Sequence, residues 1–155
     1  MTQFATVDPA SGNVLELFEE MANGELEACL ARCTSALGSW GTTSHAKRRE
    51  LLRAIARDMR AQAETLAQVA VFEMGKPATQ ARAKIEKCAR CCKFFAEHAE
   101  QFLIERNVKN NAAQSSIAFR PLGATLAIMP WNFPYWQVVR ACVPAMAAGN
   151  GILLN

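Results

Sequence analysis

The sequence of 155 residues lacks a hydrophobic run long enough to cross a membrane. Its longest clean apolar stretch lies within Thr125–Pro134 and is far shorter than the roughly 20 residues that a membrane-spanning helix needs. Hydrophobic residues make up 51% and charged residues 20%, with a formal net charge of only +3. This balance excludes a disordered chain, which has few apolar residues and a high net charge. We expect about one globular domain and no membrane partner.

Targeting signals are also missing from the first 12 residues. They contain neither the basic segment nor the apolar segment of a secretory signal. They carry Asp8 and no arginine, which disfavours a mitochondrial presequence. We therefore expect a cytoplasmic protein.

Acidic residues are absent from residues 111–155, which form the most apolar segment and are predicted to belong to the core. The basic charge is concentrated upstream and includes an arginine-rich stretch at residues 47–60. Glu50 and Asp58 interrupt this stretch, and it has no aromatic residue to stack on a base. We interpret it as the solvated face of a helix and expect no nucleic-acid partner.

A convincing metal-ligand pattern is lacking as well. Cys88 and Cys91 form a CxxC pair, but a structural zinc site needs a second pair, and Cys29 and Cys33 lie on a different predicted helix. Without a secretory signal, we expect all six cysteines to be free thiols, most of them buried. They are Cys29, Cys33, Cys88, Cys91, Cys92 and Cys142. We expect no metal.

The first two thirds of the chain are predicted to form a hairpin and three helices, over residues 4–18, 23–37, 44–74 and 78–103. Asn23 and Ser44 are the predicted N-caps of the first two helices. Gly75 is predicted to end the second helix, and Pro77 to restart the chain at the first turn of the third.

The last third contains one strand–helix–strand unit. Buried strands are predicted at Ala124–Met129 and Gly151–Leu154. A helix is predicted from Pro134 to about Ala148, kinked or split by Pro144. A further strand is predicted within residues 114–120.

These elements predict an α/β fold. An N-terminal hairpin and helices (residues 1–103) are followed by a connecting strand segment (104–122) and by the start of a doubly wound, Rossmann-like parallel sheet (123–155). Two parallel strands cannot cover their own faces or edges, so we expect the sheet to be incomplete in this chain.

The best candidate site follows the first of these strands, at Asn132. Ligands of open α/β sheets bind beyond the carboxyl ends of the strands. An amide there, next to a helix N-terminus, can donate a hydrogen bond to a developing oxyanion, which is worth about 3 kcal/mol of barrier. The residues alone are equally compatible with a turn asparagine between prolines.

The sequence around this asparagine resembles the NAD(P)-dependent aldehyde dehydrogenase superfamily. The family signature PWNFP stands at Pro130–Pro134, within the similar segment Phe119–Asn150. Glu73–Pro77 (EMGKP) and Ile85–Cys88 (IEKC) resemble a second family region. The resemblance covers essentially the whole chain and is strongest to succinate-semialdehyde dehydrogenases.

The resemblance implies roles for the residues around this turn. Asn132 resembles the asparagine that stabilises the tetrahedral intermediate. The strand end resembles part of the binding site for NAD or NADP, at Ile128, Met129, Pro130, Trp131, Asn132 and Asn155. At Asn155 the family usually has a lysine, and an amide offers no charge to a 2′-phosphate, which weakens the prediction of NADP.

The substrate is predicted from the helix that follows. Phe133, Trp136, Gln137 and Arg140 recur at i, i+3, i+4 and i+7 and therefore share one face. In the family, members that oxidise succinate semialdehyde carry arginine at the last position. The resemblance thus implies oxidation of an aldehyde with a distal carboxylate, held by bidentate hydrogen bonds. A surface arginine on an amphipathic helix is the alternative.

The family reaction also needs a nucleophilic cysteine and a glutamate base, and neither motif is present. Gly149-Asn150-Gly151 ends a helix and is not a phosphate loop. We therefore expect the chain alone to be inactive. The alternative function is that of a non-enzymatic truncated fragment, which pairs with other subunits through a segment like residues 104–120. The full-length protein is expected to be a homodimer or homotetramer.

Overall fold

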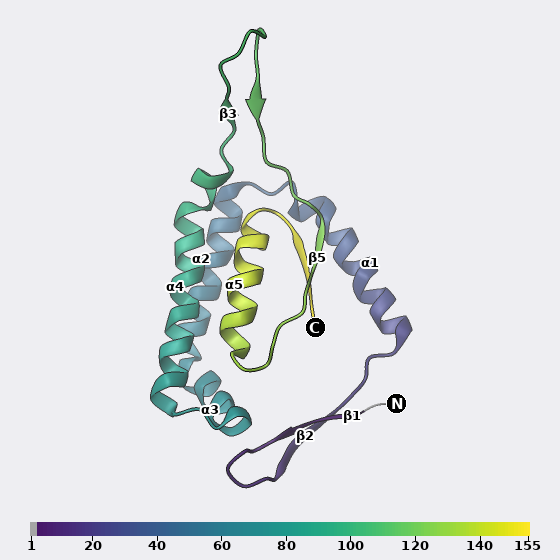
Figure 1. Cartoon of the computed structure of the whole chain (residues 1–155), viewed down its shortest axis with the longest axis vertical. Helices are drawn as coiled ribbons and strands as arrows, with labels where there is room; N and C mark the ends of the chain where they lie inside the picture. Colours follow the sequence, from purple (N-terminus) through teal and green to yellow (C-terminus); the bar gives the residue numbers. More distant parts are fainter. Residues whose placement is uncertain (1–2) are drawn as a thin grey trace.

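The computed structural model describes residues 3–155, and its centre is a layer of packed helices. Helices α2 (His45–Ala61), α4 (Ala78–Leu103) and α5 (Pro134–Ala147) run side by side, with α3 (Ala63–Met74) at one end (Figure 1). Small side chains and thiols let these helices approach closely. The main core cluster consists of Leu52, Ala56, Cys88, Ala89, Cys92, Ala96, Val139, Val143 and Ala147.

Two predicted helix boundaries are confirmed and two are wrong. The Ser44 hydroxyl accepts a hydrogen bond from the Lys47 amide (3.3 Å), and Gly75 ends α3 at φ 61°. Helix α1 (Asn23–Trp40), however, is capped at Ala22, whose amide donates to the Glu25 carboxylate (3.0 Å). The helix predicted over residues 44–74 breaks at Gln62, which leaves the helical region at φ −99°, ψ 12°. No glycine or proline marks this break in the sequence.

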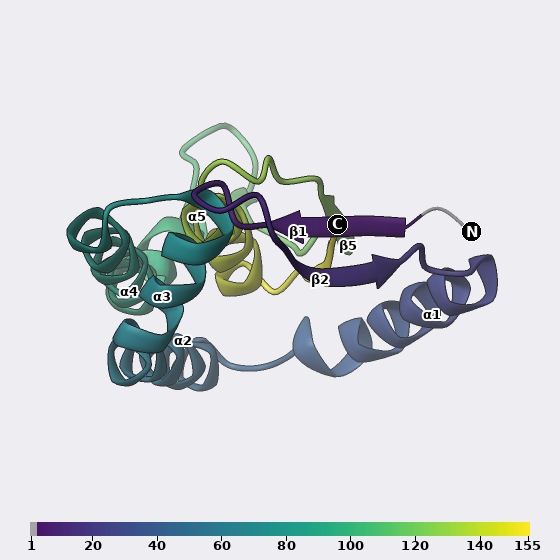
Figure 2. The same cartoon turned by 90° about the horizontal axis from the view of Figure 1, so that it is seen from below.

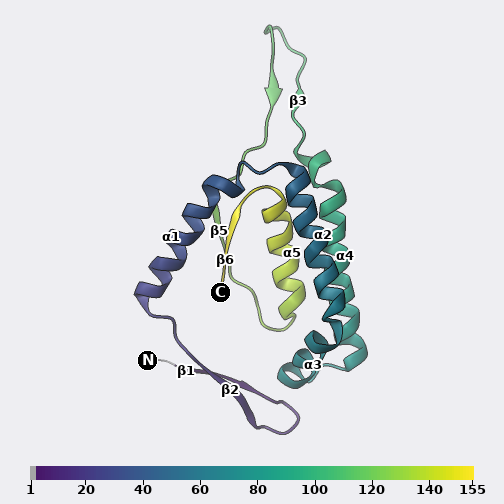
Figure 3. The same cartoon turned by 180° about the vertical axis from the view of Figure 1, so that it is seen from behind.

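The predicted strand–helix–strand unit is confirmed. Strands β5 (Ala124–Ala127) and β6 (Gly151–Leu154) are parallel neighbours, with Ala124 opposite Gly151. Helix α5 contacts them from one side and α1 from the other (Figures 1 and 3). Helix α5 continues through Pro144 without a split, and the Pro144 carbonyl accepts a hydrogen bond from Ala148 N at 3.0 Å in the last turn.

The prediction that both strands are buried is wrong for most of their residues. Three of the four residues of β5 are exposed, and β6 is half-buried except for its exposed last residue. The pair forms a separate two-stranded sheet among residues 3–155. Each strand therefore has only one hydrogen-bonded neighbour.

Two antiparallel hairpins lie at opposite ends of the molecule. Strands β1 (Gln3–Val7) and β2 (Val14–Glu19) form the predicted first hairpin, which crosses the end near α3 (Figure 2). Strands β3 (Arg106–Asn107) and β4 (Ser116–Ile117) form a second, projecting hairpin, called the β3–β4 arm below (Figure 1). The strand predicted over residues 114–120 is therefore much shorter than expected.

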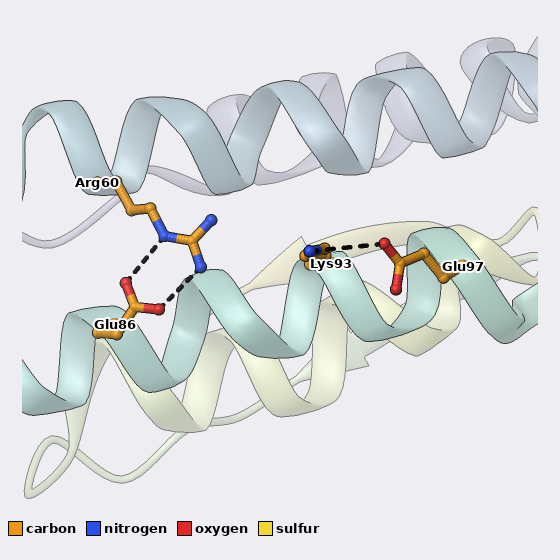
Figure 4. A network of polar contacts seen from close by, with 4 residues as sticks. All are labelled: Arg60, Glu86, Lys93 and Glu97. Atoms are coloured by element: carbon orange, nitrogen blue, oxygen red, sulfur yellow. Dashed lines mark hydrogen bonds and ion pairs between the residues drawn. The ribbon is translucent and has the colours of Figure 1, made fainter.

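The arginine-rich helix α2 is only partly the solvated face that the sequence predicts. Arg60 forms a two-bonded ion pair with Glu86 of α4, at 2.8 and 2.9 Å, and Lys93 pairs with Glu97 (Figure 4). Arg48 is buried, at 6% exposure. It donates to backbone carbonyls rather than facing solvent.

Among residues 3–155, no helix has both the length and the apolar character that a membrane crossing requires.

Candidate functional site

The carboxyl ends of β5 and β6 bring the two parts of the predicted cofactor site together. Ala127 lies opposite Leu154, and the backbone N–H of Asn155 donates a hydrogen bond to the Ala127 carbonyl at 3.1 Å. Asn155 therefore lies beside the start of the segment Ile128–Trp131. Ile128 is 68% exposed and Trp131 is 79% exposed. The strand ends thus present an open surface that includes the exposed side chain of Asn155.

Asn132 lies in the turn between β5 and α5 and is exposed. Phe133 is the N-cap residue of the helix, at φ −141° and ψ 66°, and Pro134 is the first helical residue. The first backbone N–H groups of a helix have no partner inside it, so positive partial charge gathers at this end. Asn132 therefore lies directly before the N-cap residue of α5, beside the helix N-terminus.

The four residues of the predicted substrate face have different surroundings in the structure. Lysine ammonium groups from the neighbouring elements lie over the rings of Phe133 and Trp136. Gln137 is half-buried, and Arg140 is exposed. Residues 3–155 include no carboxylate within ion-pair distance of Arg140, so its guanidinium is free to meet an anion.

The lysines were not identified by the sequence reasoning. Lys76 Nζ lies 4.1 Å and Lys84 Nζ 5.2 Å from the centre of the Phe133 ring. Lys87 Nζ lies 3.6 Å from the centre of the Trp136 ring. Lys76 lies in the EMGKP motif and Lys87 in the IEKC motif, but neither motif reveals the partner rings.

Tyr135 fixes the start of α5 against α3. Its hydroxyl donates to the Leu66 carbonyl at 3.0 Å. Burial, and to a smaller extent the charge of Glu73, raises the pKa of Tyr135. The phenol thus stays protonated at neutral pH and acts as an anchor.

The buried cysteines are poorly suited to nucleophilic attack. Burial raises the pKa of Cys88 to about 12 and that of Cys92 to about 11, and it also raises the pKa of Cys91 and Cys142. A thiol with a raised pKa stays protonated, whereas the thiolate is the reactive form. All six cysteines are free thiols, as predicted. Within residues 3–155, no group of three His, Cys, Asp or Glu side chains is arranged to hold a metal ion.

A cavity of about 460 Å³ lies elsewhere, between α1 and β6. It is lined by Cys33, Leu37, Met146 and Ile152, among others. Its walls come mainly from α1 and from residues 151–153 of β6, with Leu51 of α2 and Met146 of α5, and none of the predicted site residues lines it.

Curated relatives resemble the chain along its whole length. It is 40% identical over 154 residues to "Succinate semialdehyde dehydrogenase [NAD(P)+] Sad" of Escherichia coli, which covers 99% of this chain and 33% of the relative. It is also 40% identical over 151 residues to a probable NADP⁺ succinate-semialdehyde dehydrogenase of Synechocystis, covering 97% and 33%. The chain therefore spans about a third of the length of these relatives.

Solved structures share the fold. A structure of Gox0499 matches with a TM-score of 0.96 and 30% identity, over 99% of this chain and 34% of that one. The succinic semialdehyde dehydrogenase of Streptococcus pyogenes, solved with NADP⁺, matches with a TM-score of 0.93 and 28% identity, over 97% and 33%. The sequence profile of the aldehyde dehydrogenase family matches residues 1–155. The chain is thus a member of the aldehyde dehydrogenase family.

Proposed function

We propose that this chain contributes the oxyanion donor and part of the dinucleotide site to the NAD(P)-dependent oxidation of an aldehyde to a carboxylic acid. The proposed substrate is succinate semialdehyde and the product is succinate. The observation that carries the proposal is the position of Asn132, exposed between the end of β5 and the start of α5, within the PWNFP motif.

Asn132 is the proposed catalytic residue. Its side-chain amide donates a hydrogen bond to the oxygen that becomes negative when a thiolate adds to the aldehyde carbon. The adjacent helix N-terminus favours the same negative charge. The attacking cysteine and the general base are not identified within this chain.

Arg140 is proposed to bind the distal carboxylate of the substrate, with Phe133, Trp136 and Gln137 lining the way to it. Arg140 lies within α5, seven residues after its N-cap residue Phe133 and about two turns from the oxyanion donor. Its exposed guanidinium can form two parallel hydrogen bonds with a carboxylate. Neighbouring aromatic rings supply apolar contact for the short carbon chain.

The strand ends fit one portion of a nicotinamide dinucleotide. The exposed Asn155 amide can hydrogen-bond a ribose hydroxyl, and the segment Ile128–Trp131 offers backbone groups beside it. When bound, the dinucleotide supplies the hydride acceptor. Asn155 carries no charge, so the residues present here give no preference for the 2′-phosphate of NADP.

A chimaeric enzyme tests the proposal. Residues 1–155 replace the matching third of the Escherichia coli relative Sad, and NAD(P)H formation from succinate semialdehyde is measured. We expect Asn132→Ala to lower kcat by about 10²–10³-fold, because one oxyanion donor is lost. We expect Arg140→Gln to raise KM for succinate semialdehyde and leave KM for butanal unchanged. Full activity of the Asn132→Ala chimaera would contradict the proposed catalytic role.

A second candidate function is that of a subunit-interaction module without activity of its own. The supporting observation is the β3–β4 arm, which projects away from the helices (Figure 3) and exposes Val108 (42%) and Ile117 (53%). Co-expression of the tagged chain with full-length Sad tests this function. Recovery of mixed oligomers that disappear with Ile117→Asp would support it, whereas exclusively separate species would contradict it.

A further inference from the structure

Three lysines gather at the start of α5 and form what we call the lysine cluster: Lys76, Lys84 and Lys87. Lys76 and Lys84 lie over the Phe133 ring, and Lys87 lies 3.6 Å from the centre of the Trp136 ring. The first lysine follows α3 and the other two occupy successive turns of α4. The tertiary fold therefore directs three ammonium groups at the two aromatic residues that follow Asn132.

The lysine cluster has no carboxylate partner. Within residues 3–155, none of its ammonium groups lies within 4.0 Å of an acidic oxygen. The closest acid in the sequence, Glu86, is held by Arg60 instead (Figure 4). All three lysines are nevertheless half-buried. Aromatic faces offset part of the lost hydration of an ammonium group but leave its charge uncompensated.

Most other charges near this end of α5 have the same sign. No acidic residue occurs after Glu105, and Arg140 lies on α5 itself. The N-terminus of α5 adds a positive partial charge. The charge of Glu73 reaches this region, since it raises the pKa of Tyr135. Glu73 forms no ion pair with the lysine cluster. The charges around the start of α5 are therefore predominantly positive.

The space inside the cluster is too small to enclose a ligand. The cavity bounded by Lys76, Lys84 and Phe133 has a volume of about 10 Å³, which is the size of a single water probe. A ligand can therefore meet only the outer side of the ammonium groups. This geometry fits attraction of a small anion toward the site, which raises its local concentration.

We propose that the lysine cluster is an anion-recognition surface that draws the carboxylate of a short anionic aldehyde toward Asn132 and Arg140. The inference rests on the proposed function, since it assigns an anionic substrate to the same site. It adds three residues, one between α3 and α4 and two on α4, that recognise charge before the substrate reaches α5. The cluster acts through space and needs no contact with the reacting carbon.

Titration of the full ¹⁵N-labelled chain with succinate tests the proposal by NMR, with Trp136 indole and residues 133–137 as probes. Succinamide, which is neutral and of similar length, is the control ligand. We expect succinate alone to shift these signals, with weak affinity that falls as salt is added. The double variant K84Q/K87Q should weaken binding at least about threefold.

Two further variants distinguish the loss of local positive charge from damage to the fold and from the loss of net charge. K84R/K87R keeps both charges and should bind succinate like the parent chain. K47Q/K109Q removes the same charge from exposed positions away from α5 and should also leave binding unchanged. The proposal is overturned if K84Q/K87Q binds succinate normally, or if succinamide shifts the same signals equally.

Arg140→Gln in the same titration distinguishes this inference from the proposed function. Weaker binding with K84Q/K87Q alone would support the lysine cluster and contradict the role of Arg140. Weaker binding with Arg140→Gln alone would contradict the lysine cluster and support the role of Arg140. We expect both variants to weaken binding.

Discussion

The guanidinium of Arg48 donates a hydrogen bond from Nη1 to the carbonyl oxygen of Ala147, 99 residues along the chain, at 3.3 Å. Its Nη2 donates to the carbonyls of Trp40 (3.2 Å) and Gly41 (2.9 Å). One buried cation thus meets the carboxyl ends of α1 and α5, where unpaired carbonyls and the helix dipoles favour positive charge. Arg48 thereby joins α1 to the helical layer.

Replacing Arg48 with methionine should destabilise the chain by about 2–4 kcal/mol, because three carbonyls lose a charged donor. Chemical denaturation monitored by circular dichroism measures the change. Arg53→Met on the exposed side of the same helix is the matched control and should alter stability by less than about 0.5 kcal/mol. Equal effects of the two variants would contradict the role given to Arg48.

Gly149→Ala should destabilise the chain at the same junction. Gly149 has φ +88°, and an added Cβ would lie 2.7 Å from Arg48 Nη2 and 2.9 Å from Pro121 Cγ. We expect a loss of at least about 1 kcal/mol from backbone strain alone. Gly38→Ala, inside α1 with open space around its Cβ, should instead stabilise by about 0.5–1 kcal/mol. Thermal unfolding measures both changes. A melting temperature that rises in Gly149→Ala, or falls in Gly38→Ala, would contradict the prediction for that variant.

Ile85→Ala should be among the most damaging core substitutions. Ile85 is 0% exposed and packs with Ala67, Ala70 and Ala81, where α3 meets α4. Small neighbours cannot expand to fill the space, so we expect a cost of about 2–5 kcal/mol. Leu122→Ala, at a side chain that is 95% exposed, should be nearly neutral in the same urea titration.

Stability should fall in alkaline solution because of Cys88 and Cys92. Burial raises the pKa of these thiols from an ordinary 9.0 to about 12 and about 11. Their contribution is fully present below pH 9 and is lost as the pH rises through these folded-state values, because the unfolded chain releases the protons first. Urea unfolding at a series of pH values measures this slope.

The double variant C88A/C92A should make the alkaline slope shallower, whatever its effect on stability at neutral pH. A residual slope is expected from Tyr135, whose pKa burial also raises. An identical slope in the parent chain and in the double variant would show that these thiols do not control the alkaline response.

Local signals predicted much of the fold. Ser44, Gly75 and Pro134 act at helix ends through their own backbone or side-chain chemistry, and each lies where the sequence places it. Two apolar runs on either side of one helical pattern likewise predicted the β5–α5–β6 unit. Exact boundaries were less predictable: the break at Gln62 has no local marker, and it depends on the packing of α3 against α4.

The candidate site was predicted only as far as its motif extends. PWNFP located Asn132 and the strand end, since these residues are adjacent in the sequence. The contact of Lys84 with Phe133 joins residues that are far apart along the chain, and helix periodicity says nothing about which element packs opposite. The buried state of Arg48 was missed for the same reason, because its partners are carbonyls of two other elements.

The β1–β2 hairpin touches the helices only lightly, near α3, so we expect it to open independently of them. Every residue of β2 is exposed, whereas Ile85, Cys88 and Cys92 of α4 are completely buried. An isolated two-stranded hairpin is marginally stable in water. Its amide protons should exchange with solvent through local opening, long before those of α4. Native-state hydrogen exchange would then order the elements by persistence, with the hairpin as the first unit to open and the α2–α4–α5 layer as the last.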